Sequence, residues 1–415
     1  MMRISTNTIY DSNISSMNQQ QTNLLHTQLQ VSSGLRVMTP ADDPAAAAQV
    51  IEVSQSNAAN TQYATNRNAA TTSLSMSEGI LQSVTTLIQN IQTTAVNAGN
   101  GTLNNSDRQT LATNLQGQLN QLIGLANSQD GTGNYLFSGL QGKTQPFTTT
   151  ASGIQYQGDS GQHLIQVSGS QQMAVNVTGA DLFMNVKNGN GSFVTAASSS
   201  NSGSGIISQG NLGTPPPTAA QQGNSYTLTF SVSGTGATTY TVTGTDPSGA
   251  ALPASSLPAN QPYTSGQTIS FNGLQFNIQG TPASGDTFTV APSSNVSLFQ
   301  TVQNLITTLN TPVVAGNTTS SAAFTQQLNQ AEGNLNQGLN QVLTVRAAIG
   351  SNLNTITALQ SSGSALGLQY QTTLSQLQDL DYSKALSQLS QQQLGLQAAM
   401  QSFKTVSSLS LFNYM

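Results

Sequence analysis

The side chains that most often do chemistry are few in this chain and far apart. Its 415 residues include two histidines, His26 and His163, no cysteine, and only 6% charged residues, against about 25% in an average globular protein. An acid–base pair needs two titratable groups beside a substrate cleft. The two histidines belong to different segments, and neither has an acidic or nucleophilic partner nearby in sequence. We therefore expect both to be solvated or interface polar residues.

Two adjacent aspartates form the densest acidic spot. Asp42 and Asp43 lie between Pro40 and Pro44, and a proline disfavours helix in the residue before it. The segment should therefore be a turn that links two helices. Asp43 is placed to cap the second helix, with Pro44 at its first position, and Arg36 is near enough to pair with either carboxylate. We predict capping and turn formation here, not acid–base catalysis.

A second acidic motif, Asp379 and Asp381, resembles part of a cation-binding loop. Calcium loops supply further oxygen ligands at fixed spacing, and none follows here. A helix break with an N-cap explains the pair better. The glycine-rich runs lack the lysine and the strand context of a phosphate-binding loop. The sequence thus predicts no catalytic residue, no metal and no cofactor, and we expect a protein that is not an enzyme.

Composition also narrows the partners. The net charge is -5, and the nine Lys and Arg residues are scattered singly, so we expect no nucleic-acid binding. No stretch approaches the roughly 18 apolar residues of a membrane helix. The first ten residues hold no apolar run of a secretory signal. We expect no membrane insertion, and any export should occur without a cleaved leader.

The two ends of the chain carry the same pattern. Apolar and amide residues recur at steps of three and four between Ile14 and Val31, and again between Tyr382 and Phe403. This spacing is typical of one stripe on a long helix, as in a coiled coil. Charged residues are almost absent from both ends. Because a lone helix has nothing to bury such a stripe against, the terminal helices need each other and neighbouring copies of the molecule.

We predict that the apolar members of the two stripes, with the leucine, valine and phenylalanine that follow the second one, form a subunit interface. They are Ile14, Met17, Leu24, Val31, Leu386, Leu389, Leu396, Met400, Phe403, Val406, Leu409 and Phe412. The ends should be disordered or fraying in the monomer and should pair as an inner helical layer on assembly. A fully buried large side chain contributes about 1.5–3 kcal/mol. A handful of these residues would offset much of the cost of ordering.

The remaining helices follow the same reasoning. Helix is predicted from Pro44 to about Asn97, then from a cap at Asn105 or Ser106 through Leu125, and from about Ser297 to Leu309. A last long segment should begin at Ala323. Its apolar positions repeat at seven at Leu335, Val342, Ile349 and Ile356, which is the repeat of a coiled-coil seam. We therefore expect a long helical rod built from both halves of the chain.

The middle of the chain reads as strands. Tyr226–Val232 alternates cleanly, and Thr268–Phe271 and Leu274–Ile278 flank an Asn272-Gly273 turn, which predicts a hairpin. Residues 198–205 and 214–218 look like loops. We predict an α+β protein with an antiparallel β domain inserted between helical halves. The expected segments are 1–40 and 379–415 (assembly helices), 41–140 and 297–378 (rod), and 141–296 (β domain).

Several short motifs together resemble the flagellin superfamily. They are Met-Arg-Ile-Ser-Thr at 2–6, Ser-Ser-Gly-Leu-Arg-Val at 32–37, Pro-Ala-Asp-Asp-Pro-Ala-Ala at 40–46, Asn-Gly-Thr-Leu at 100–103, Gly-Asn-Tyr-Leu-Phe-Ser-Gly at 133–139, and the ending at 399–403 and 408–412. Flagellins usually show Asp-Asp-Ala-Ala-Gly where this chain has Asp-Asp-Pro-Ala-Ala. The proline form is similar to the hook–filament junction proteins of that superfamily.

The resemblance implies an extracellular structural adaptor of the bacterial flagellum, at the hook–filament junction. Copies would ring the distal end of the hook, joined on one side to hook-associated protein 1 and on the other to flagellin. The chain would be exported unfolded through the flagellar type III channel, and we also expect an export chaperone.

Two other functions stay open at this point. A flagellin, the filament subunit itself, shares the terminal pattern and would polymerise alone into long filaments. A surface adhesin would use the β domain to bind glycans, which needs clustered exposed aromatic side chains. The middle offers only the dispersed Tyr226, Tyr240 and Tyr263.

Overall fold

The structure, a computed structural model, describes residues 6–408. Two compact units divide them. The terminal unit holds the described residues up to Arg67, the segment Val167–Ser170 and the described residues from Thr357 on, and the central unit holds Asn68–Gln166 and Gln171–Ile356. Helices α2 (Pro44–Ala98) and α5 (Thr318–Gln378) contribute residues to both units. No helix in the described part of the chain is long and apolar enough to span a membrane.

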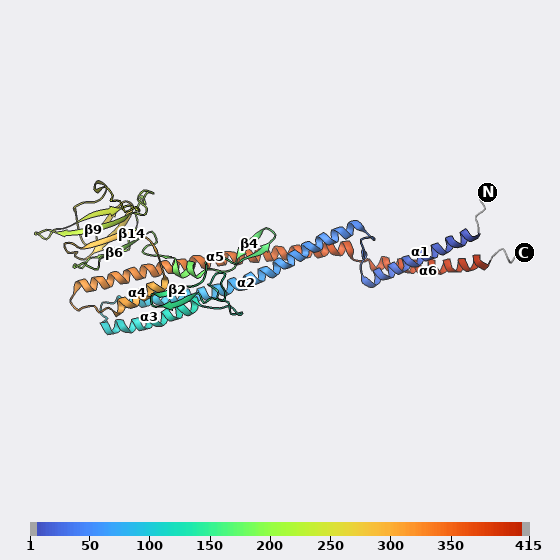
Figure 1. The fold of residues 1–415 in the computed structure, drawn as a ribbon, viewed down its shortest axis with the longest axis horizontal. Coiled ribbons are helices and arrows are strands. Elements are labelled where there is room, and N and C mark those ends of the chain that lie inside the picture. The colour runs from blue at the N-terminus through green and yellow to red at the C-terminus, as the bar shows by residue number, and fades with distance from the viewer. Residues whose placement is uncertain (1–5, 409–415) are drawn as a thin grey trace. The chain divides into compact units, whose positions relative to one another are not determined.

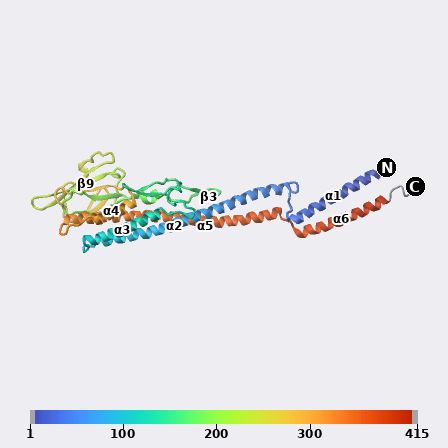
Figure 2. The same ribbon diagram turned by 60° about the horizontal axis from the view of Figure 1, so that its bottom comes forward.

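The terminal unit pairs helices from the two ends of the chain. Helix α1 (Thr6–Ser33) lies beside α6 (Tyr382–Ser408) in both ribbon views (Figure 1, Figure 2). The first part of α2 meets the last part of α5, where the Asn60 amide donates to the carbonyl of Gly363 (2.7 Å). The predicted pairing of N- and C-terminal segments is therefore confirmed.

The link from α1 to α2 has the predicted turn chemistry. The Asp43 carboxylate accepts from the backbone N–H of Ala46 (3.1 Å) and so caps α2, whose first residue is Pro44. Arg36 pairs with the same carboxylate at 3.1 Å. The prediction that these aspartates make a turn and a cap is confirmed.

The central unit has a helical layer with a closely packed seam. The residues predicted to repeat at seven on α5, from Leu335 to Ile356, are all buried, as are Leu74, Leu81 and Ile88 on α2. Arg346 of α5 pairs with Glu78 of α2 at 2.6 Å. Helices α3 (Asn105–Ala126) and α4 (Leu298–Asn310) pack against each other in the same unit.

Two predicted helix starts are wrong. The cap of α3 is Asn104, not Asn105 or Ser106. Its side chain accepts from the N–H of Asp107, and the Asp107 carboxylate accepts from the N–H of Asn104, which is a capping box. Helix α5 begins at Thr318, not Ala323, because Asn317 accepts from the backbone N–H of Ser320 and so caps an extra turn.

The β region of the central unit contains two larger antiparallel sheets. The first has the strand order β11 (Gln261–Pro262), β10 (Thr238–Thr245), β9 (Ser225–Val232), β14 (Thr287–Pro292) and β6 (Phe193–Ala197). The second contains β12 (Thr268–Phe271), β13 (Leu274–Gln279), β7 (Ile206–Ile207) and β8 (Asn211–Leu212). Asn272 and Gly273 have φ of 49° and 75°, as a type I′ turn requires, so the predicted hairpin is confirmed.

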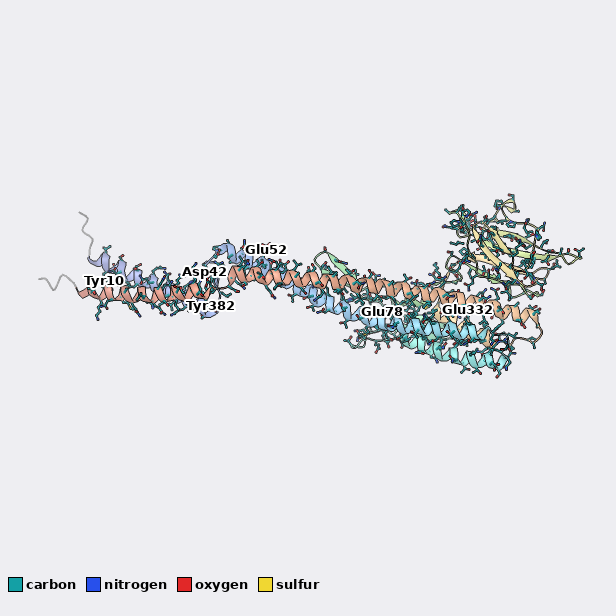
Figure 3. The ribbon with its side chains drawn as sticks, turned by 180° about the vertical axis from the view of Figure 1, so that it is seen from behind. Tyr10, Asp42, Glu52, Glu78, Glu332 and Tyr382 are labelled. Carbon is teal, nitrogen blue, oxygen red and sulfur yellow. The ribbon has the colours of Figure 1, made fainter. Side chains whose placement is uncertain are left out.

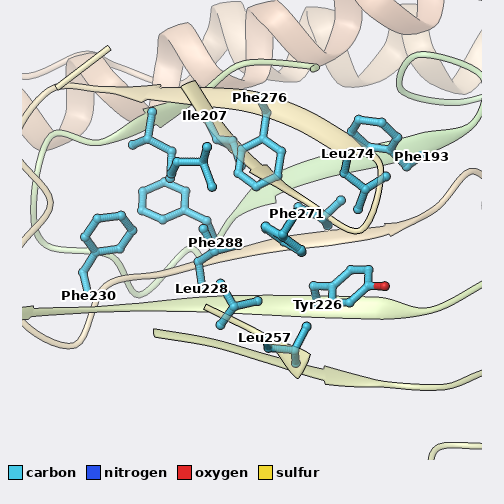
Figure 4. Close-up of a cluster of buried hydrophobic side chains, with 14 residues drawn as sticks. Phe193, Ile207, Tyr226, Leu228, Phe230, Leu257, Phe271, Leu274, Phe276 and Phe288 are labelled. Carbon is cyan, nitrogen blue, oxygen red and sulfur yellow. The ribbon is translucent and has the colours of Figure 1, made fainter. Parts of the chain in front are cut away.

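Fourteen buried side chains, from Phe193 to Val290, fill the space between these sheets (Figure 4). There are also three small two-stranded sheets: β1 (Phe147–Thr150) with β2 (Gly153–Tyr156), β5 (Val186–Lys187) with β15 (Asn295–Val296), and β3 (Leu164–Ser168) with β4 (Gln171–Ala174). The last two residues of β3 are assigned to the terminal unit. The predicted α+β class, with an inserted antiparallel region, is confirmed.

Candidate assembly surface of the terminal helices

Helices α1 and α6 run antiparallel along their shared length. Tyr10, near the start of α1, stacks on Phe403, near the end of α6, with ring centroids 5.0 Å apart. Between these ends, the small side chains of Thr27 and Ala385 are buried. Because small residues let two helices approach closely, Thr27 and Ala385 mark the line along which α1 and α6 touch.

On α1, the predicted stripe divides between two directions. Met17, Leu24 and Val31 follow one another at seven residues and are half-buried. Ile14 is exposed, and so are Leu25 and Leu29, which follow Ile14 by about three and four helical turns. We call the face formed by these three residues the open face of α1. Tyr10 is partly exposed but belongs to the contact with α6 through Phe403.

On α6, the same division occurs. Leu389, Leu396 and Phe403 repeat at seven and are half-buried, whereas Leu386 and Met400 are exposed. Tyr382 lies five turns before Met400, on the same side. Tyr382, Leu386 and Met400 form the open face of α6, and Figure 3 labels Tyr10 and Tyr382 on the two helices.

The structure thus brings together six of the predicted interface residues in the α1–α6 pair and turns Ile14, Leu386 and Met400 outward. Leu409 and Phe412 lie outside the described residues, and the side chain of Val406 is not described. The sequence reasoning missed three strongly exposed leucines: Leu25 at 54%, Leu29 at 57% and Leu394 at 68% exposure. Leu25 follows Ile14 by eleven residues, and Leu29 follows Leu25 by four. This helical spacing was the signal that could have identified Leu25 and Leu29 from the sequence.

The contact between α1 and α6 is also partly polar. The side-chain oxygens of Gln20 and Gln392 are buried and have no hydrogen-bond partner. A buried polar atom without a partner costs about 1–3 kcal/mol. Two long helices that bury only a narrow stripe and two unsatisfied amides are a weak pair in isolation.

A tight joint holds the inner end of the pair. The backbone N–H of Arg36 donates to the carbonyl of Gln378 (2.7 Å), and that of Leu380 donates to the carbonyl of Gly34 (2.9 Å). The Arg36 guanidinium also donates to the carbonyl of Leu377 (2.6 Å) at the end of α5. Gly34 has a φ of 74°, and a Cβ there would lie 3.0 Å from the hydroxyl of Tyr382. The joint therefore needs glycine for its backbone conformation.

Charged residues gather at this joint. His26 lies 2.8 Å from a carboxylate oxygen of Asp42, whose other oxygen accepts from the backbone N–H groups of Met38 and Thr39. The hydrogen bond from the backbone of Thr39, followed by that from His26, lowers the pKa of Asp42 to about 2. The N–H of Ala46 and the Arg36 guanidinium likewise lower the pKa of Asp43. His26 and Asp42 are thus paired with each other, and so are Arg36 and Asp43.

A polar groove of about 500 Å³ between α1 and α6 borders the joint and is lined by His26, Arg36, Asp381 and Lys384 among others. Asp381 caps α6 by accepting from the N–H of Lys384 (3.1 Å), and Asp379 accepts from the hydroxyl of Ser375. The predicted helix break is confirmed. Within residues 6–408, no three His, Asp or Glu side chains come together as a metal site would require.

The comparisons of this sequence with known proteins all match flagellar proteins. Residues 4–142 match the family described as bacterial flagellin N-terminal helical region. Over 411 residues the chain is 30% identical to flagellar hook-associated protein 3 of Salmonella typhimurium, and the match covers 99% of each chain.

Solved structures of flagellar proteins are also similar to this chain. The crystal structure of flagellar hook-associated protein 3 from Legionella pneumophila is similar to this chain with a TM-score of 0.72 at 32% identity, and the match covers 79% of this chain and 98% of that one. The flagellar junction protein FlgL from the same organism gives a TM-score of 0.67 at 32% identity, over 80% of this chain and 100% of that one.

Proposed function

The chain belongs to the flagellar hook-associated protein 3 family, and from this premise we propose how its terminal helices serve the hook–filament junction. It is a structural, non-enzymatic component of the extracellular flagellum, at the junction between hook and filament. We propose that its open faces on α1 and α6 are the surfaces by which it packs into that junction.

The single observation that carries this proposal is the pair of open faces. Ile14, Leu25 and Leu29 on α1, and three large side chains on α6, stay exposed although α1 and α6 already cover each other. Each half-exposed side chain would gain about 1 kcal/mol if covered. Few charged side chains interrupt these faces, so covering them carries little desolvation penalty. Neighbouring helices of similar character would supply the missing cover.

The partners follow from the same reasoning and from the family. We propose hook-associated protein 1 on the hook side, flagellin on the filament side, and neighbouring copies of this chain around a ring. We propose further that export proceeds through the flagellar type III channel and that an export chaperone shields the terminal stripes beforehand. A chain without cysteine suits passage in an unfolded state.

The adhesin alternative finds no support in the β region. Tyr226 is buried, and Tyr240 and Tyr263 both pack against Phe230. The hydroxyl of Tyr263 donates to the carbonyls of Ile278 and Gly280. Tyr240 and Tyr263 are half-buried and border a pocket of only about 120 Å³.

A variant of the open face of α1 tests the proposal. Leu25→Asp with Leu29→Asp changes two side chains that are exposed in the single chain, so the purified protein should keep its fold and unfolding temperature. Cells carrying it should build hooks but shed flagellin into the medium. Leu368→Asp is the matched control, because Leu368 is also an exposed leucine, on α5 in the same unit. Normal filaments on the double variant would contradict the proposal.

A further inference from the structure

The larger β sheets form a self-contained module within the central unit. Its fourteen core residues all lie between Phe193 and Val290, and none comes from a helix. We call residues 188–294 the β module. A module with its own core folds around that core and does not need the helices beside it for burial.

A narrow neck joins the β module to the rest of the central unit. Both crossings of the chain lie side by side, because Asn295 pairs with Lys187 and Val296 pairs with Val186 in the two-stranded sheet of β5 and β15. The carbonyl of Asn188 accepts from the hydroxyl of Ser293 (2.8 Å) just above it. A single two-stranded neck of this kind leaves rotation about its axis open.

The β module also rests on α5, and most of the hydrogen bonds of this contact involve amide side chains. Besides the three described next, Gln209 donates to the carbonyl of Asn329, and the hydroxyl of Thr319 donates to the carbonyl of Ser202. The Gln326 side chain accepts from the backbone N–H of Ile207 (2.8 Å), and the Gln330 side chain donates to the carbonyl of Thr195 (3.1 Å). The Asn334 side chain accepts from the N–H of Gly189 (2.9 Å). These three amides follow one another at four residues, so they form one stripe on α5, which we call the amide latch.

The apolar face of α5 packs in the helical layer and not against the β module. Leu328, Ala331 and Leu335 are buried in the helical layer, whereas the latch residues reach the backbone of the β module. A shallow, largely open surface groove of about 300 Å³, lined by Ile206, Ala322 and Thr325 among others, lies at the start of the same contact. The contact is therefore largely polar. Because a protein hydrogen bond replaces hydrogen bonds to water, its net contribution to docking is small, and polar contacts of this kind allow relative motion of modules.

We propose that the β module is a hinged module, which docks reversibly on α5 through the amide latch and pivots on the β5–β15 neck. This mobility is separate from assembly through the terminal helices. It would let the β module change position while the helical layer of the central unit keeps its seam.

A spin-label distance measurement tests the hinge in the full chain. Because the chain has no cysteine, Ala250→Cys on the β module and Asn340→Cys on α5 provide two unique labelling sites, both exposed. The labelled protein should show a dominant narrow distance population and a minor broad one. Gln326→Ala with Gln330→Ala should increase the broad population several-fold.

Two controls separate the hinge from a loss of folding. Asn354→Ala removes an exposed amide of α5 outside the latch and should leave the distance distribution unchanged. Circular dichroism and the near-ultraviolet signal of the tyrosines should show the β module still folded in the double variant. An unchanged distribution in the double variant, or broadening that appears only together with unfolding of the β module, would overturn the proposal.

Discussion

The ring of Tyr10 lies 5.0 Å from the ring of Phe403, measured between centroids and tilted by 51°. The two residues come from opposite ends of the chain, and their contact joins the start of α1 to the end of α6. In this arrangement α1 and α6 contact each other, and their open faces stay exposed. A partner subunit that covers these faces must therefore pack against an existing pair of helices.

Removing either ring should loosen the outer end of that pair. Aromatic pairs contribute about 0.5–1.5 kcal/mol beyond their burial. Phe403→Ala should speed amide exchange in the first turns of α1, although the substitution is on α6. A double-mutant cycle with Tyr10→Ala should give a coupling energy of about that size. Additive effects would mean that the rings do not stabilise each other.

Charge placed between the terminal helices should separate folding from assembly. Leu396 is half-buried beside α1, so Leu396→Asp should leave the β module folded yet abolish filament attachment. Ala398→Asp adds the same charge at an exposed position of the same helix and should attach filaments nearly normally. Normal motility of the Leu396→Asp strain would refute this role.

The joint should not tolerate a β-branched residue. Gly34→Val forces a side chain into the left-handed region, which costs about 1–2 kcal/mol, and also displaces the Tyr382 hydroxyl. The free energy of unfolding of the terminal unit should fall by at least that amount. Gly79→Ala is the opposite control: a Cβ there meets no atom within 4 Å, and the helix should gain roughly 0.5–1 kcal/mol. Equal effects of the two substitutions would contradict this account of the joint.

Acid should loosen the joint before the core. The pKa of Asp42 is lowered from 3.8 to about 2, so the folded state binds its proton less readily than the unfolded state. Its contribution to stability is complete above about pH 4 and is lost as the pH falls toward 2. The amide signals of Met38 and Thr39 should shift over that interval. In Asp42→Asn that pH dependence should disappear, and its persistence would point to another carboxylate.

Regular repeats made much of the fold predictable. The seven-residue spacing from Leu335 to Ile356 identified a buried seam because only one face of a helix carries that repeat. The Asn272-Gly273 turn identified its hairpin because both residues tolerate positive φ. Sheet order was not predictable, since it depends on pairings between strands far apart in sequence.

The candidate surface was predictable only in part. A stripe on α6 indicates that something packs there, but it does not indicate which flank the chain's own partner covers, so the outward position of Leu386 and Met400 needed the structure. The pairing of His26 with Asp42 arises from the turn between two helices. The contribution of the predicted interface residues to subunit contacts, and the segment boundaries from 1–40 to 379–415, stay predictions.

Hydrogen exchange of α1 and α6 in the purified monomer and in isolated hook–filament junctions tests the central claim most directly. We expect the described part of α1 to exchange far faster than the seam of α2 and α5 in the monomer. Its protection should rise by orders of magnitude on assembly, when the open faces are covered. Protection of α1 and α6 in the lone monomer equal to that of the central seam would contradict the account.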